Sequence, residues 1–121
     1  MSGIARMRSI VLDCPDPKAL SDFYAAVTGW QIIGIEHDWV TLSDGGPIRL
    51  AFQLASDHKP PVWPDPDHPQ QLHLDLLVDD LAKAEAEVQE LGAVKHAHQP
   101  GEGFTVFLDP AGHPFCLCAV D

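Results

Sequence analysis

The chain has 121 residues, 45% of them hydrophobic, which is enough for one domain with a packed core and too few for two independent cores. Its formal net charge of -11 repels phosphate backbones and anionic lipids, so we expect neither a nucleic-acid partner nor a membrane partner. The 3 cysteines fit no disulfide framework, and no apolar run reaches the length of a membrane span, which predicts a cytoplasmic protein with free thiols.

The first half of the chain predicts a strand, a helix and three more strands. An apolar run from residue 9 leads to Asp16 and Pro17, which suit the N-cap and the first position of a helix. Apolar residues then recur at helical spacing as far as Gly29, and glycine is favoured at the left-handed residue that ends a helix. Three runs typical of strands follow, at residues 31–36, 39–42 and 48–54.

The second half of the chain repeats this order. An apolar strand begins near His73, Asp79 or Asp80 caps a helix, and Gly92 ends that helix. Three further strands are predicted at about 94–98, 104–108 and 115–120. Because element order, turn residues and helix length all recur, we predict an α+β fold of two tandem βαβββ modules, at about 7–54 and 72–120.

The two modules are joined by residues 56–69, which contain 5 prolines. Proline lacks a backbone N–H and excludes regular helix or central strand, so this segment predicts an extended, polyproline-like linker. Trp63 within it either covers the mouth of a cleft or a dimer surface, or anchors the linker by packing. We expect the whole chain, 1–121, to be a single domain whose strands form a curved mixed sheet around a cleft.

Strand alternation predicts which side chains face that cleft. Around the fifth strand, Leu72, Leu74 and Leu76 share one face, which must pack under the helices, while His73 and Asp75 share the other. The same reasoning assigns four more residues from both modules to the cleft, namely Ser9, Arg49, Gln53 and Cys116. The repeat matches Ser9 with His73, and alignment of the turn before each last strand matches Arg49 with Cys116.

Each of these residues has a chemical interpretation and a structural one. Asp75 can orient His73 as a general base or ligand contact, or the two can be a polar pair in the cleft wall. Arg49 suits an anionic ligand, or it forms an ion pair with Asp13 or Asp75. Cys116 is a nucleophile, a soft metal ligand or inert packing, and a strand thiol is most often the last.

Three sequence motifs give the chain a family resemblance. It resembles the vicinal oxygen chelate superfamily, which includes glyoxalases, bleomycin-resistance proteins and dioxygenases, and is closest to short glyoxalase-like domain proteins. The motifs are DPKALSDFYAAVTGW, LHLDLLVDDL and LDPAGHPFCLC. The resemblance implies the paired βαβββ fold, a homodimer and a divalent metal held by residues of both modules. Its four ligand slots fall at Ser9, Arg49, His73 and Cys116, of which only His73 keeps the expected type.

The expected function is therefore binding without a metal. We expect a glyoxalase-like protein with a degraded metal site and no cofactor, binding a small flat or anionic metabolite or antibiotic through the six cleft residues. The alternative is a metal-dependent lyase, isomerase or dioxygenase of the vicinal oxygen chelate type. In that case His73 is the catalytic base or a metal ligand, helped by Cys116 or Gln53.

Overall fold

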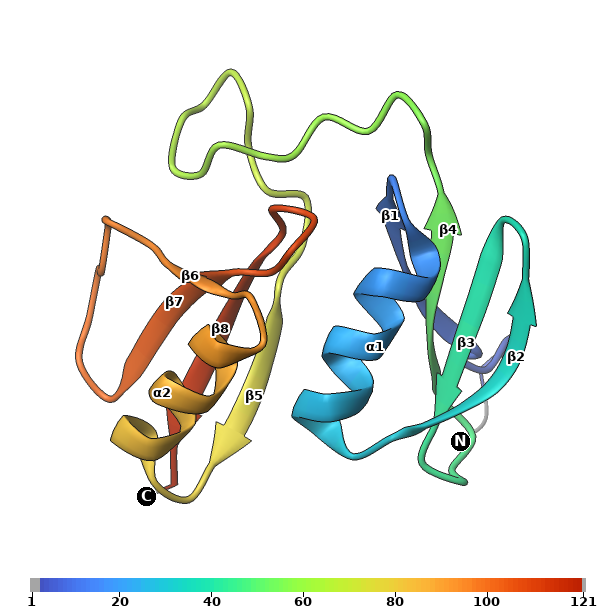
Figure 1. Cartoon of the computed structure of the whole chain (residues 1–121), viewed down its shortest axis with the longest axis horizontal. Helices are drawn as coiled ribbons and strands as arrows, with labels where there is room; N and C mark the ends of the chain where they lie inside the picture. The colour runs from blue at the N-terminus through green and yellow to red at the C-terminus, as the bar shows by residue number, and fades with distance from the viewer. Residues whose placement is uncertain (1–2, 121) are drawn as a thin grey trace. The chain divides into compact units, whose positions relative to one another are not determined.

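The computed structural model of the chain describes residues 3–120 and divides into two compact units, Met1–His58 and Lys59–Asp121. Each unit contains one four-stranded mixed sheet and one helix in the order βαβββ (Figure 1). The predicted α+β class and the tandem βαβββ modules are thus confirmed. That both modules act as one domain around a common cleft stays a prediction.

Module one is a sheet in the order β1-β4-β3-β2 with one helix packed on β3 and β4. Strands β1 and β4 run parallel, and the other neighbours run antiparallel. Its elements are β1 (Ser9–Cys14), α1 (Pro17–Thr28), β2 (Gln31–Glu36), β3 (Trp39–Ser43) and β4 (Arg49–Leu54).

The ends of α1 confirm the predicted capping residues. The Asp16 carboxylate accepts the backbone N–H of Ala19 at 3.1 Å, and Pro17 is the first helical residue. Gly29 has the left-handed φ of 75°, and its N–H bonds to the carbonyl of Ala25 at 2.9 Å. Each cap satisfies a free backbone group with a neighbouring residue, so the limits of α1 are set locally.

The core of module one lies between α1 and the sheet. Tyr24 on α1 is fully buried and stacks on Phe52 of β4, with ring centroids 5.7 Å apart. Phe23 meets Tyr24 edge-on at 5.0 Å. Cys14 of β1 belongs to this core and has no exposed surface.

Module two has the same architecture. Its sheet has the order β5-β8-β7-β6, with β5 parallel to β8 and the helix packed against β8. Asp80, and not Asp79, is the N-cap, since its carboxylate accepts the N–H of Lys83 at 3.1 Å. The elements are β5 (Leu74–Val78), α2 (Leu81–Glu90), β6 (Val94–Lys95), β7 (Phe104–Leu108) and β8 (Pro114–Ala119).

Two strands of module two are shorter than predicted. Strand β5 begins at Leu74, so His73 precedes it. Leu74 and Leu76 are half-buried, whereas Leu72 is exposed and does not belong to the predicted leucine face. Strand β6 covers 2 residues, where 94–98 was predicted. Its continuation is replaced by the Gln99 side chain, whose amide bonds to both the N–H and the carbonyl of Val106, each at 2.9 Å. The Val106 carbonyl still accepts the backbone N–H of His96 at 3.0 Å, whereas the N–H of Val106 is satisfied by a side chain where a strand backbone was expected.

The prediction of an extended linker is wrong for residues 62–68. The N–H of Val62 bonds to the carbonyl of His68 at 2.7 Å, which closes the segment into a compact loop. The Asp65 carboxylate accepts the N–H of Asp67 inside that loop, as aspartate commonly does in turns. Trp63 packs its ring edge-on against His96 and His98, with centroids 5.5 and 5.1 Å apart. Trp63 therefore anchors the loop to module two.

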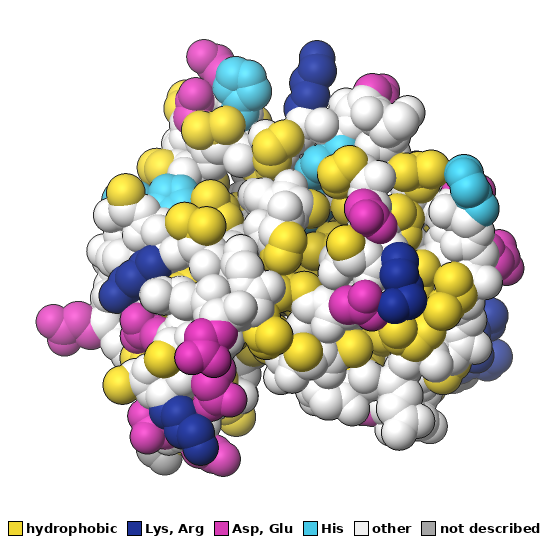
Figure 2. Space-filling model, viewed as in Figure 1, with side chains coloured by type: hydrophobic (Ala, Val, Ile, Leu, Met, Phe, Trp, Pro, Cys, Tyr) yellow, Lys and Arg dark blue, Asp and Glu magenta, His cyan; other side chains and the backbone are white. Residues whose placement is uncertain are grey.

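Acidic side chains dominate the charged surface. Figure 2 shows Asp and Glu side chains gathered at the lower left, over α2 and its neighbouring turns. Within residues 3–120, no helix is both long enough and apolar enough to cross a membrane.

Candidate functional site

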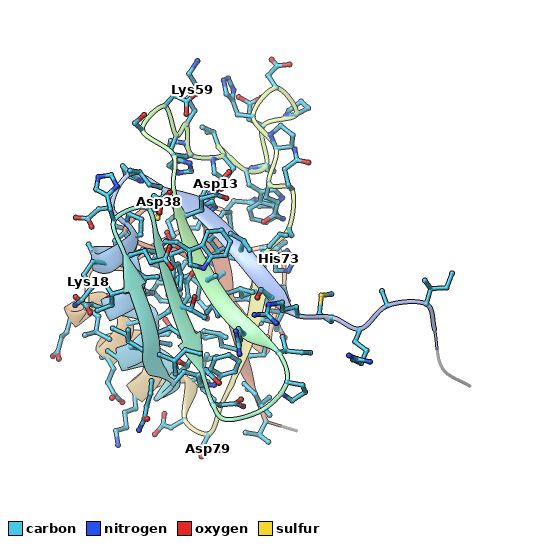
Figure 3. The ribbon with its side chains drawn as sticks, turned by 90° about the vertical axis from the view of Figure 1, so that its right-hand side faces the viewer. Asp13, Lys18, Asp38, Lys59, His73 and Asp79 are labelled. Atoms are coloured by element: carbon cyan, nitrogen blue, oxygen red, sulfur yellow. The ribbon has the colours of Figure 1, made fainter. Side chains whose placement is uncertain are left out.

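A pocket of about 220 Å³ lies within module two, beside the start of β5. Trp63 from the folded loop and Phe104 and Val106 from β7 give it apolar walls. Polar groups enter from His73, Gln70 and the thiol of Cys116. Figure 3 labels His73 where the chain descends from the loop into β5. The pocket combines apolar walls with a few polar groups, as small-molecule sites do.

His73 and Asp75 are brought together as the strand alternation predicted. The Nε2 of His73 lies 3.2 Å from a carboxylate oxygen of Asp75. The side chains are 39% and 62% exposed, so this contact is reached by solvent and is an ion pair only when His73 is protonated. Asp75 therefore orients the imidazole without desolvating it.

Cys116 lies on the same side of the sheet as Asp75. The two residues are direct partners in the parallel β5–β8 ladder, and Cys116 is only 7% exposed. Burial, followed by the charge of Asp75 and a hydrogen bond to it, raises the pKa of the Cys116 thiol to about 11. In the metal-free protein the thiol is therefore protonated at neutral pH, which argues against a nucleophilic role.

The remaining predicted site residues belong to module one. Ser9 and Arg49 are ladder partners of β1 and β4, so they lie side by side at one end of these strands. Gln53 lies 4 residues further along β4, opposite Asp13. That separation is about 13 Å along a strand, and the alternative ion pair of Arg49 with Asp13 stays a prediction. The convergence of Ser9 and Arg49 with residues of module two stays a prediction.

The strand registers correct one equivalence between the modules. Asp75 pairs with Cys116 in module two, and Val11 pairs with Ala51 at the corresponding place in module one. Cys116 therefore corresponds to Ala51, and Arg49 is two residues displaced from that position. The turns before β4 and β8, which suggested the other alignment, differ in how they enter the strands.

Sequence reasoning missed part of the pocket wall. Phe104 and Val106 were assigned to a strand without a role, yet both line the pocket. Val106 is the ladder partner of Cys116, so once the register is known, alternation places both on the pocket side. The two-residue spacing of Phe104 and Val106 indicates that they share one face, but only the pairing of β7 with β8 shows that this face is the pocket side.

The metal chelate implied by the family resemblance requires donors from both modules, and module one supplies poor ones. Ser9 offers a neutral hydroxyl, a weak ligand, and Ala51, which corresponds to Cys116 in the strand register, offers no donor atom. Arg49, the slot that the sequence alignment gave, is a permanent cation that repels a metal. The ligand atoms of His73, Asp75 and Cys116, in contrast, all lie within 4.8 Å of one another. The donor set of this chain therefore does not fit the two-module chelate, whereas three donors of module two fit a divalent cation.

Solved structures show the same fold at low sequence identity, with different activities. A glyoxalase/bleomycin resistance protein/dioxygenase family enzyme from Burkholderia phytofirmans PsJN is 19% identical, with a TM-score of 0.76 over 97% of this chain and 100% of its own. TnmS3, an antibiotic binding protein from Streptomyces sp. CB03234, is 21% identical, with a TM-score of 0.62 over 100% of both chains. The oxidase ChaP-H2 is 17% identical, with a TM-score of 0.65 over 98% of this chain and 96% of its own.

These structural likenesses show the fold alone, because a shared fold does not fix an activity. No curated protein sequence matches the chain significantly. The sequence profile of the glyoxalase-like domain matches residues 9–118, which is nearly the whole chain. The chain therefore belongs to the glyoxalase-like domain family, within the vicinal oxygen chelate superfamily.

Proposed function

We propose that this protein binds a small, flat organic molecule, with the module-two pocket as the primary site. The observation that carries the proposal is the pocket itself, where the rings of Trp63 and Phe104 stand beside the imidazole of His73. Aromatic walls favour a flat ligand by stacking, and a single imidazole gives it direction through a hydrogen bond.

The pocket volume limits the size of the ligand. At about 220 Å³ it is smaller than the roughly 300–1,000 Å³ typical of sites for drug-sized molecules. A single aromatic ring with one polar substituent fits this space. A larger antibiotic would place only one of its rings here. Arg49 in module one, together with Ser9 and Gln53, is proposed to favour an anionic ligand.

The similarity to TnmS3, described as an antibiotic binding protein, supports binding without turnover. A second candidate is a metal-dependent lyase, isomerase or dioxygenase, favoured by the donors gathered at His73, Asp75 and Cys116. In that case His73 binds the metal or moves a proton on the substrate. A bound divalent metal would supply Lewis-acid stabilisation of a substrate oxygen.

The binding proposal is tested on isotope-labelled protein in the presence of a chelator, so that no metal contributes. We would titrate benzoate, salicylate and 4-hydroxybenzoate, and the corresponding uncharged amides, and follow backbone amide signals. We expect shifts concentrated at Phe104, Val106 and Cys116. Trp63→Ala and His73→Ala should weaken binding about tenfold each, the equivalent of one lost aromatic or hydrogen-bonding contact.

Two matched variants separate this result from general effects. His37→Ala removes an exposed histidine from the β2–β3 turn and should leave binding unchanged. Arg49→Gln should weaken the carboxylates more than the amides if Arg49 contributes to charge selection. A binding site in this pocket would be refuted if no backbone amide signals of β7 and β8 shifted. It would also be refuted if His37→Ala and His73→Ala lowered the affinity equally.

Assembly and location belong to the same proposal. The family resemblance supports a homodimer, and 3 free cysteines support a reducing, cytoplasmic location. Light scattering on a size-exclusion column tests the first, and a mass near 13.2 kDa would contradict it.

A further inference from the structure

Three different metal-binding side chains meet at the beginning of β5. They are the imidazole of His73, the carboxylate of Asp75 and the thiol of Cys116, with all ligand atoms within 4.8 Å of one another. The Nε2 of His73 lies 3.2 Å from an oxygen of Asp75. In a tetrahedral zinc site with bonds of about 2.0–2.3 Å, neighbouring ligand atoms lie roughly 3.3–3.8 Å apart. Small side-chain movements are therefore enough to close a site.

The backbone already places these donors. His73 and Asp75 are two residues apart, so extended chain points both to the same face. Asp75 and Cys116 are direct partners in the β5–β8 ladder, which fixes the distance between their backbones. Asp75 and Cys116 therefore lie on paired strands, which hold a site's geometry better than loops do, and His73 lies directly before β5.

The chemistry of the donors selects the metal. Nitrogen, oxygen and sulfur ligands together suit zinc, whereas magnesium and calcium prefer oxygen alone. Three protein ligands leave one position of a tetrahedral zinc for an exogenous ligand. His73 and Cys116 also line the pocket, so an exogenous ligand has space beside two of the three donors.

We propose that module two binds one Zn²⁺ through His73 Nε2, the Asp75 carboxylate and the Cys116 thiolate. This ligand set lies wholly within residues 59–121 and uses neither Ser9 nor Arg49. It therefore differs from the two-module chelate that the family resemblance implies. The proposal goes beyond the binding of an organic ligand and does not depend on it.

The proposal is tested with Co²⁺ as a spectroscopic substitute for zinc. Untagged, reduced protein freed of metal is titrated with Co²⁺ in the absence of any organic ligand. We expect saturation at one equivalent, visible absorption typical of tetrahedral cobalt, and a near-ultraviolet thiolate-to-cobalt charge-transfer band. Zn²⁺ should then displace the cobalt and abolish both signals.

Variants assign the ligands. Cys116→Ser should remove the charge-transfer band, whereas Cys118→Ser, two residues along the same strand, should keep it. Asp75→Asn changes an exposed side chain and leaves the core intact, so it should fold and bind Co²⁺ at least about tenfold more weakly. His73→Ala should weaken binding at least as much.

His96 and His98 form the competing site for adventitious metal, since they lie close together against Trp63. The double variant His96→Ala/His98→Ala should retain the cobalt spectrum. Loss of binding in this variant with retention in Asp75→Asn and Cys116→Ser would overturn the proposal, as would the lack of any charge-transfer band. Because organic-ligand binding is measured in chelator and cobalt binding without organic ligand, either proposal can fail alone.

Discussion

The buried thiol of Cys116 gives a quantitative prediction for chemical reactivity in the metal-free protein. Its pKa is raised from 9.0 to about 11, first by burial and then by the Asp75 carboxylate. At pH 8 the thiolate fraction falls from about 9% to about 0.1%, a loss of roughly 90-fold. A more basic thiolate is intrinsically more nucleophilic, with a Brønsted slope of about 0.4–0.5, which recovers about 6- to 10-fold. Alkylation of Cys116 should therefore be about tenfold slower than that of an unperturbed thiol, before any steric protection.

The assay is iodoacetamide alkylation of a Cys118→Ser variant in chelator, followed by mass spectrometry of the Cys116 peptide. Because a raised pKa keeps the thiol protonated longer, the rate should keep climbing with pH until about 11 instead of levelling near 9. Asp75→Asn removes the negative charge of Asp75 and its hydrogen bond as a carboxylate, but not the burial of the thiol. It should therefore shift the rate profile only part of the way back toward pH 9. A profile that levels below pH 9.5, or one that Asp75→Asn leaves unchanged, would refute the assigned environment.

Two further predictions concern the turn before β8. The buried Asp109 carboxylate accepts two backbone N–H groups through one oxygen, at 2.9 and 3.0 Å. Asp109→Ala should therefore lower the free energy of unfolding, measured in urea, by about 3 kcal/mol. Asp109→Asn keeps an acceptor oxygen and should lower it by about 1 kcal/mol. Equal losses in the two variants would contradict this reasoning. Gly112→Ala would place a methyl group 2.5 Å from the Cβ of Pro60. Gly103 has a similar φ but open space around it, so Gly112→Ala should destabilise the protein by about 1–3 kcal/mol more than Gly103→Ala. Gly112→Ala should also change the fluorescence of Trp63.

Local chemistry explains why much of the fold could be predicted from the sequence. Asp16, Pro17 and Gly29 each act on their own helix ends, and the helix they predict is the helix observed. Strands β2 and β7 also have their predicted limits, because short apolar runs between clear turns leave little choice. Such signals depend on a few neighbouring residues, so a single sequence contains them.

The parts that could not be predicted depend on contacts between distant residues. The Gln99 side chain shortens β6 by bonding to Val106, 7 residues away, and nothing in its composition distinguishes it from an exposed glutamine. The loop around Trp63 closes by backbone bonds and by packing on His96, although its prolines suggested an extended course. In the site, alternation placed His73 beside Asp75, but placing Cys116 with them required the register of the β5–β8 ladder.

That register also shows where the duplicated scaffold differs in chemistry. At the ladder positions that hold Asp75 and Cys116 in module two, module one has Val11 and Ala51, a pair of apolar side chains. Ser9, matched with His73 by its distance from the N-cap, is the only polar residue of the corresponding three. At these three described positions module one therefore holds no set of metal donors, although its strand order and parallel pairing are the same. The scaffold fixes where three side chains meet, and the residue types at those positions alone decide that a thiol, a carboxylate and an imidazole meet in module two.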